Sequence, residues 1–443
     1  MRLVRGIADW RPRTPFYYGW LVLAVAAIGA FAATGVSQIV LGGIQGLIIE
    51  DMGWDNTTLA LAVTAGTWIS GLVTPFVGRL TDRTGPRPLM PVAALVMGVV
   101  FFALAGIGAV WQFYAAYIVG RAIANPILIG VVPRTMAVNF FRRRRNLAIG
   151  FTAMARPFGG AINIQAISLI ARTYDWRVAY RALGVFALVM AIPLFVVMRR
   201  RPEDIGLRPD GDENLEPARS PRQRTPTPRT ELSDQEPEFD WRPGEAVRTS
   251  TFWFILMAIS VIILTSGSVS FQIVPFLKDS GQSQTVAAIA LSLSSLMGAI
   301  ANPIGGLLSD RFSPRVMWLV LLVVSAAVMS LFLATSTGPQ RFIVVVVWGT
   351  TTGGLNILGS MLMAEYFGRA SYGSITGLMG PIQTGALGLG PTFGAVLFKL
   401  TDSYMTLFVY GAASYMLAMF FIYMARPPRL PQRAVAGRQP AIG

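Results

Sequence analysis

Runs of about 20 or more apolar residues recur along the whole chain of 443 residues, and they constrain its fold more than any other feature. Such a run is long enough to cross a bilayer as a helix, which rises about 1.5 Å per residue. Only helices and closed barrels satisfy their backbone groups in lipid, and these runs are continuous rather than alternating. A 53% hydrophobic composition, 13% charged residues and a mean hydropathy of +0.55 agree with this. The sequence predicts an all-α membrane protein.

Twelve transmembrane helices can be placed on these runs. They are expected at residues 18–43, 57–80, 88–108, 111–136, 146–170, 178–198, 252–277, 284–308, 316–335, 341–364, 372–398 and 403–425. Charge then predicts their sidedness, because cytoplasmic loops carry an excess of Lys and Arg. With this arrangement 28 basic residues lie on one side and six on the other. We expect both termini and the long middle loop in the cytoplasm, and the net charge of +15 to reflect topology rather than nucleic-acid binding.

The middle loop divides the chain. Residues 200–250 are rich in Pro, Arg, Asp and Glu and contain almost no apolar residues, so we expect a disordered cytoplasmic linker there. It separates an N-terminal six-helix bundle, residues 1–199, from a C-terminal six-helix bundle and tail, residues 251–443.

The two halves share an internal repeat. PFVGRLTDRTGPR at residues 75–87 and PIGGLLSDRFSPR at residues 303–315 both fit P-x-x-G-x-L-x-D-R-x-x-P-R, at an offset of 228. A second match, at an offset of 227, pairs Phe140, Arg142 and Gly150 with residues 367, 369 and 377. Duplicated halves related by a pseudo-two-fold axis along the membrane normal are a transporter architecture.

On these residues the chain resembles the major facilitator superfamily, whose signature loop is similar to GRLTDRTGPRP at residues 78–88. Finer motifs resemble its monocarboxylate and oxalate–formate transporter branch. They are YYGWLVL (17–23), NFFRRRRNLAIGF (139–151), DWRVAYRALG (175–184), RPEDIGLRPDG (201–211) and EYFGRASYGSITGL (365–378). The resemblance implies alternating access about a central site. The branch also implies an Arg in the eighth span, but residues 284–308 of this chain carry no charge.

The repeated loops provide candidates for a conformational latch. A carboxylate at a helix end can cap exposed amides, and an Arg can meet helix carbonyls across an interface. The resemblance implies that such loops latch the halves on the cytoplasmic side. The latch candidates are Gly78, Asp82, Arg83, Arg87, Asp310 and Arg311.

Two arginines are candidates for substrate binding. Arg121 and Arg156 each lie ten residues, or about 15 Å, into an expected span, and no Asp or Glu occurs at matching depth. A charge near the midplane is costly and indicates function, and Arg can bind a carboxylate through two hydrogen bonds. Arg121 alternatively has a structural role, bonded to polar groups of neighbouring helices. Polar residues that could line the same opening are Gln38, Asn125, Ser266, Asn356 and Gln383.

These residues favour a secondary or facilitative transporter of a small organic anion, a carboxylate in particular. Alternatives are an exporter of amphiphilic or drug-like compounds in the same fold, and a transporter-like sensor without flux.

With no His, no Cys and no midplane carboxylate, neither an enzyme, a metal site nor a cofactor is expected. Protons could travel on the substrate itself, and exchange or facilitated diffusion are equally open. Arg outnumbers Lys 35 to 2, which favours a bacterial inner membrane. We expect a monomer.

Overall fold

The computed structural model describes residues 15–211 and 241–429, and every regular element in these residues is helical. The N-terminal half contains α2 (Tyr18–Ala33), η1 (Thr34–Val36), α3 (Gln38–Met52), α4 (Asn56–Thr84), α5 (Pro86–Ala105), α6 (Val110–Ile123), η2 (Ala124–Gly130), α7 (Val131–Phe140), α8 (Arg145–Thr173) and α9 (Trp176–Val197). The connecting segment contains η3 (Pro202–Ile205), η4 (Pro209–Gly211) and α10 (Pro243–Val247). The C-terminal half contains α11 (Ser250–Asp279), α12 (Gln284–Ser309), α13 (Pro314–Ala334), α14 (Gly338–Phe367), α15 (Tyr372–Thr401) and α16 (Tyr404–Met424).

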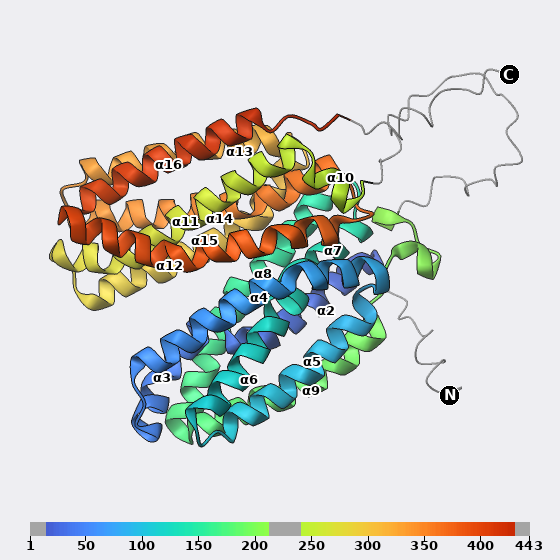
Figure 1. Ribbon diagram of the computed structural model, residues 1–443, viewed down its shortest axis with the longest axis horizontal. Coiled ribbons are helices and arrows are strands. Elements are labelled where there is room, and N and C mark those ends of the chain that lie inside the picture. The colour runs from blue at the N-terminus through green and yellow to red at the C-terminus, as the bar shows by residue number, and fades with distance from the viewer. Residues whose placement is uncertain (1–14, 212–240, 430–443) are drawn as a thin grey trace, which may run out of the picture.

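Twelve crossing segments form the fold of the described residues, as the apolar runs predict. Ten are long and apolar enough to span a membrane by length and composition alone. The other two are α8, with 29 residues, and α15, with 30 residues. The third and fourth spans are separate helices, because α5 ends at Ala105 and α6 begins at Val110. These segments form two bundles, which are visible in Figure 1.

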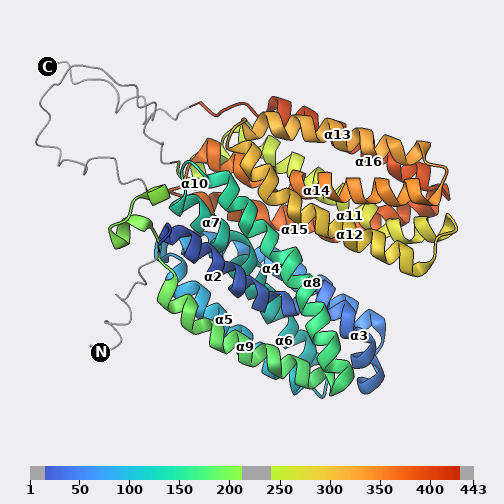
Figure 2. The ribbon, with the colours of Figure 1, turned by 180° about the vertical axis from the view of Figure 1, so that it is seen from behind.

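Among the described residues, the two bundles meet mainly along two pairs of helices. The helix α4 packs on α15, and α8 packs on α12. We call the end of the molecule that holds η3, η4 and α10 the linker end, and the opposite one the far end. Figures 1 and 2 show the bundles close together at the linker end and diverging toward the far end.

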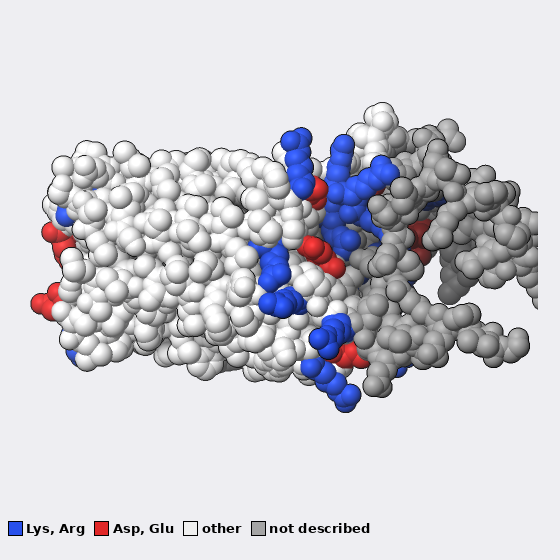
Figure 3. All heavy atoms as spheres, turned by 90° about the horizontal axis from the view of Figure 1, so that it is seen from above, with Lys and Arg blue, Asp and Glu red and all other residues white. Residues whose placement is uncertain are grey.

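Charge separates the two ends. In Figure 3, Lys and Arg gather around the linker end, whereas an almost uncharged band covers the middle of the visible face. Exposed arginines at the linker end include Arg79, Arg83, Arg142 and Arg311. An apolar band next to a basic end is what a multi-pass membrane protein requires.

Two spans depart from the continuous helices expected from the sequence. In the span predicted at 18–43, α2 gives way to the 3₁₀ turn η1, and Ser37 is extended (φ −72°, ψ 153°) before α3 begins. The Asn163 side chain of α8 holds this break, donating to Phe31 O at 2.7 Å and Thr34 Oγ1 at 2.6 Å. In the span predicted at 111–136, η2 is a π-helical segment between α6 and α7.

Part of the segment expected to be a disordered linker is folded. Residues 200–211 form η3 and η4, and α10 leads into α11. Trp241 is buried, with its ring 5.4 Å from that of Phe367. Disorder over the whole of 200–250 is therefore wrong for these flanks, and residues 212–240 lie outside the described chain. Local contacts with the bundles explain the order, since this polar sequence has no core of its own.

Candidate functional site

Asp82 links the two halves at the linker end. Its carboxylate, near the end of α4, accepts hydrogen bonds from the backbone of Gly373 (3.1 Å) and Ser374 (2.6 Å) in the first turn of α15. The first amides of a helix have no partner within it, and the helix dipole favours a negative charge there. Asp82 thus caps a helix of the opposite half.

Asp310 makes the equivalent contact in the other direction. It follows α12 and accepts a hydrogen bond from the backbone of Asn146 (3.2 Å) at the start of α8. The Asn146 side chain donates in return to Ser309 O (3.0 Å). Burial raises the pKa of the Asp310 carboxyl to about 6, although the backbone hydrogen bonds oppose the shift. The offset of 228 relates Asp82 to Asp310.

Glycines allow the backbones of the two halves to touch at these points. A Cβ on Gly78 would lie 2.1 Å from the carbonyl oxygen of Gly373, and one on Gly306 would lie 2.5 Å from that of Asn146. The same holds one turn further along, where a Cβ on Gly150 would lie 2.6 Å from Asn302 O. No other residue fits such a separation without moving a backbone.

The latch arginines predicted from the sequence lie elsewhere. Arg83 is exposed and makes no hydrogen bond or ion pair within the described chain, and the same is true of Arg311. Arg87 lies over the ring of Phe195, 5.5 Å from its centre, and Phe195 belongs to the same half. Across the interface the contacts come instead from Arg145, which donates to Ala364 O at 2.7 Å, and from Arg369, which donates to Asn139 O at 3.5 Å.

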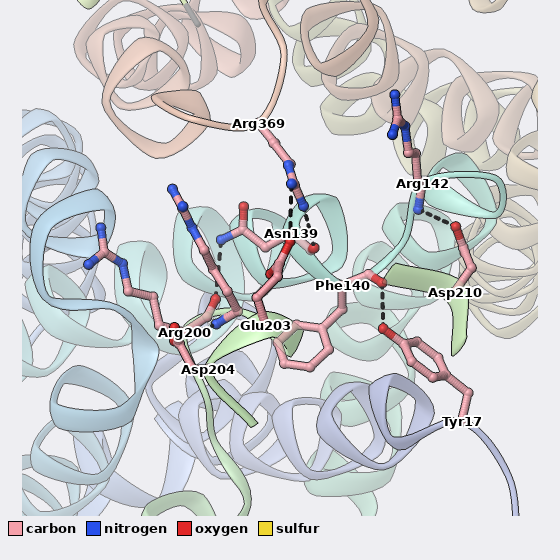
Figure 4. A network of polar contacts seen from close by, with 10 residues as sticks. Tyr17, Asn139, Phe140, Arg142, Arg200, Glu203, Asp204, Asp210 and Arg369 are labelled. Atoms are coloured by element: carbon pink, nitrogen blue, oxygen red, sulfur yellow. Dashed lines mark hydrogen bonds and ion pairs between the residues drawn. The ribbon is translucent and has the colours of Figure 1, made fainter. Parts of the chain in front are cut away.

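A polar network around the connecting segment covers the linker end (Figure 4). Asp210 accepts from the backbone amides of Arg142 (2.7 Å) and Arg143 (2.6 Å), ahead of α8. Glu203 forms an ion pair with Arg369 of the other half, at 3.1 Å. Residues 201–211, a family-like motif inside the linker expected from the sequence, therefore bind both halves.

Arg121 is buried against α4. Its side chain is 3% exposed, passes within about 3 Å of the space a Cβ on Gly66 would need, and donates to Thr67 Oγ1 at 2.7 Å. Its Nε is buried without a hydrogen-bond partner in the described chain. One hydroxyl compensates the charge only in part, because a buried guanidinium needs a carboxylate or several acceptors.

Arg156 is exposed near the middle of α8 and makes no hydrogen bond or ion pair with the described residues. It lies six residues, or about 9 Å, beyond Gly150, where α8 touches α12. Arg121 and Arg134 lie close enough to repel its positive charge. Three guanidiniums, on α6, α7 and α8, therefore lie near one another.

Arg134 is the residue that sequence reasoning missed. It lies on α7, is half-buried, and its Nε has no partner in the described chain. Its charge acts on both Arg156 and Tyr372 of α15. The sequence does place Arg134 inside the expected span 111–136, but only two residues before the end of that span.

The neutral candidates are not all brought to this cluster. Ser266 lies beside the hydroxyl of Tyr415, inside the C-terminal half. Asn356 is exposed, Asn125 and Gln383 are half-buried, and none of the three has a side-chain hydrogen bond within the described residues. The side chain of Gln38 lies outside the described part.

Comparisons with known proteins agree with this architecture. A family model of the Major Facilitator Superfamily matches residues 20–380 and 255–442. The oxalate:formate antiporter of Oxalobacter formigenes is 24% identical over 378 residues, 84% of this chain and 82% of that protein. The gentisate transporter of Corynebacterium glutamicum is 23% identical, over 85% and 79% of the two chains. Monocarboxylate transporter 4 of Mus musculus is 23% identical, over 89% and 80%.

Solved structures show the same fold. The fucose:proton symporter of E. coli superposes with a TM-score of 0.68 at 12% identity, over 93% of this chain and 99% of that one. A proton:xylose symporter superposes with a TM-score of 0.62 at 15% identity, over 93% and 96%. The family model matches nearly the whole sequence, and reciprocal helix caps from a repeated motif join two six-helix bundles. The chain therefore belongs to the Major Facilitator Superfamily.

Proposed function

We propose that this transporter moves a small organic anion, a carboxylate, by alternating access. The observation that carries the proposal is Arg156, an exposed guanidinium in the middle of α8 without a partner among the described residues. An unpaired charge at that depth is costly unless a ligand of opposite charge binds. The planar guanidinium suits the two oxygens of a carboxylate.

The surrounding charges support an anion rather than a cation. Arg121 and Arg134 add positive charge near Arg156. The carboxylates of the described membrane helices lie near helix ends, as Asp82 does in α4 and Glu365 in α14. A cationic substrate would meet three like charges without a compensating acid. The relatives named for oxalate, formate, gentisate and monocarboxylates point to the same class.

The conformation suggests the route. The halves are joined at the linker end by Asp82 and Asp310, so an anion would reach Arg156 from the far end. Release to the other side would require both caps to break while the bundles rock. The basic linker end is then cytoplasmic, in the plasma membrane of a bacterium, and this conformation faces outward.

Coupling follows from the same residues. A proton usually travels through such carriers on a buried carboxylate or His. The chain has no His, and no carboxylate of the described residues accompanies Arg156. Exchange, facilitated diffusion or a proton carried by the substrate's own carboxyl group are the schemes that these residues support.

A binding screen tests the proposal. Thermal unfolding of the purified protein is followed with formate, oxalate and gentisate, because a ligand of the folded state raises its stability with concentration. At least one acid should stabilise the wild type, and Arg156→Gln should lose that response. Arg181→Gln, which removes an exposed charge of α9, should keep it.

Two results would count against an anion site. One is equal stabilisation of the wild type and Arg156→Gln by every active acid. The other is stabilisation by a lipophilic cation such as tetraphenylphosphonium and by none of the acids, which would favour an exporter of amphiphilic compounds.

A further inference from the structure

The pseudo-two-fold relation between the halves leaves one basic site filled and its counterpart open. On one side, Arg369 in the loop between α14 and α15 binds the carboxylate of Glu203. The offset of 227 relates Arg369 to Arg142 in the loop between α7 and α8. No carboxylate of the described residues forms an ion pair with the Arg142 side chain, which is exposed. The Asp210 carboxylate next to it is bonded to the backbone amides of this loop.

A pocket of about 360 Å³ opens beside Arg142, between the two halves. The N-terminal half contributes Arg142 and Asn146 to its wall, and the C-terminal half contributes Ser309, Asp310 and Arg311. Its residues therefore come from both partners of the α8–α12 interface, at the linker end.

The groups of this pocket favour an anion. Ser309 is 4% exposed and lines the pocket, and its Oγ is buried with no hydrogen-bond partner within the described chain. The carboxylate of Asp310 is already bonded to the first turn of α8. Glu365, the other acid of the wall, lies near the charge of Arg145. Arg142 and Arg311 thus supply positive charge that the described acids do not pair.

We infer that this pocket binds a phosphate group, carried by an anionic phospholipid or by a soluble phosphate. Arg presents a fork of N–H donors that matches phosphate oxygens. Basic pockets between membrane helices on the cytoplasmic side suit phospholipid headgroups. A lipid is the source that the surroundings favour, because Phe312 lines the pocket and is 57% exposed. Beyond it, Ile304 and Leu307 offer an exposed apolar surface of α12 to acyl chains.

The ligand has a conformational effect. A phosphate held by Arg142 of one half and Arg311 of the other bridges them where Asp310 caps α8. Since the bridge exists only while the linker end is closed, binding stabilises that state. This effect does not depend on which substrate the transporter carries.

Lipid retention tests the site. The purified full-length protein is exposed to phosphatidylglycerol or phosphatidylcholine in detergent, and bound lipid is counted by native mass spectrometry. In a parallel arm, inorganic phosphate is titrated in a thermal-unfolding assay against chloride at equal ionic strength. The test variant is Arg142→Gln/Arg311→Gln. The control is Arg79→Gln/Arg83→Gln, which removes two exposed charges at the same end, Arg83 being the counterpart of Arg311.

The wild type and the control should retain phosphatidylglycerol over phosphatidylcholine, whereas the test variant should bind it about tenfold more weakly. A response to inorganic phosphate alone, lost in the test variant, would identify a soluble phosphate as the source. Equal phosphatidylglycerol and phosphate responses in the wild type and the test variant would overturn the inference, and so would a wild type that responds to neither probe. If the double variant fails to fold, Arg311→Gln alone serves as the test variant, because it should also weaken binding.

Discussion

Single glycines decide how closely the halves approach. Gly306 faces the backbone of Asn146, and a Cβ on Gly306 would lie 2.5 Å from the Asn146 carbonyl oxygen. A Cβ on the neighbouring Gly305 would lie 4.0 Å from its nearest neighbour, the Cγ2 of Ile357. Gly306→Ala should therefore destabilise the closed linker end by about 1–3 kcal/mol, the usual cost of overpacking. Gly305→Ala should leave it unchanged.

Maleimide labelling of a cysteine measures this. The chain has no native Cys, so Thr135→Cys, buried near Gly373, provides a unique thiol. Gly306→Ala should label faster than the Thr135→Cys parent, and Gly305→Ala at the parent rate. Equal rates in both glycine variants would mean that close backbone contact does not hold the closed state.

Asp310 should make the conformational equilibrium depend on pH. In the closed state burial raises its pKa to about 6, helped by the negative charge of Asp210 and opposed by Arg144. When the linker end opens, the carboxyl becomes solvated and returns toward its usual value near 4. Protonation favours the state with the higher pKa, so the closed state should gain as the pH falls from about 7.5 through 6. Solvent screening limits the change to roughly tenfold.

Spin labels on Arg83→Cys and Val316→Cys, one on each half, report this equilibrium as a distance at the linker end. The short-distance population should grow on acidification and lose its pH dependence in Asp310→Asn. A short-distance population that shrinks on acidification would contradict the sign of the argument.

Sequence patterns predicted some residues of the site and missed others for physical reasons. The repeat singled out Asp82 and Asp310 because a carboxylate next to a helix end has few roles other than capping. The same repeat also suggested Arg83 and Arg311, which make no hydrogen bond or ion pair across the interface among the described residues. Whether a charged side chain meets a partner depends on the residues that the other half places opposite it. The sequence of the motif alone does not reveal those residues.

At the scale of elements, the segment with η3 and η4 joins the halves through Glu203 and Arg369, 3.1 Å apart. Both side chains are more than a third exposed, so the pair should contribute at most about 1 kcal/mol. Glu203→Gln and Arg369→Gln should each speed the labelling of Thr135→Cys a few-fold. The double variant should label no faster than Arg369→Gln alone, because Arg369 also donates to Asn139 O.

The neighbouring acid is the control for this cycle. Asp204 accepts a hydrogen bond from the backbone of Arg201 within the same segment, at 3.1 Å. Asp204→Asn should therefore label at the parent rate. Strictly additive effects of the two single variants would show that Glu203 and Arg369 act independently.

Helix interruptions were the elements that sequence could not predict. Apolar composition is the same for a continuous and a broken span, so residues 18–43 read as one helix. The break at Ser37 depends on hydrogen bonds from Asn163, a tertiary contact with α8. Order in residues 200–211 likewise depends on Arg369 and the α7–α8 loop, although the segment looks like a linker by composition.

At the scale of the whole molecule, hydrophobic length predicted the spans and charge bias predicted two ends. The family match confirms the fold. Which end would be closed did not follow from the sequence, because the repeat gives both halves the same cap. The structure shows that the linker end is the closed one, because the reciprocal contacts of Asp82 and Asp310 lie there.

Uptake of a radiolabelled acid into proteoliposomes tests the central claim most directly. The acid is the one that stabilises the purified protein most, and Arg156→Ala, Arg156→Lys and Arg181→Gln are compared at equal reconstitution. We predict that Arg156→Ala loses more than about tenfold in initial rate, that Arg156→Lys keeps part of it, and that Arg181→Gln equals the wild type. Uptake of that acid by Arg156→Ala at the wild-type rate would contradict an anion site at this arginine.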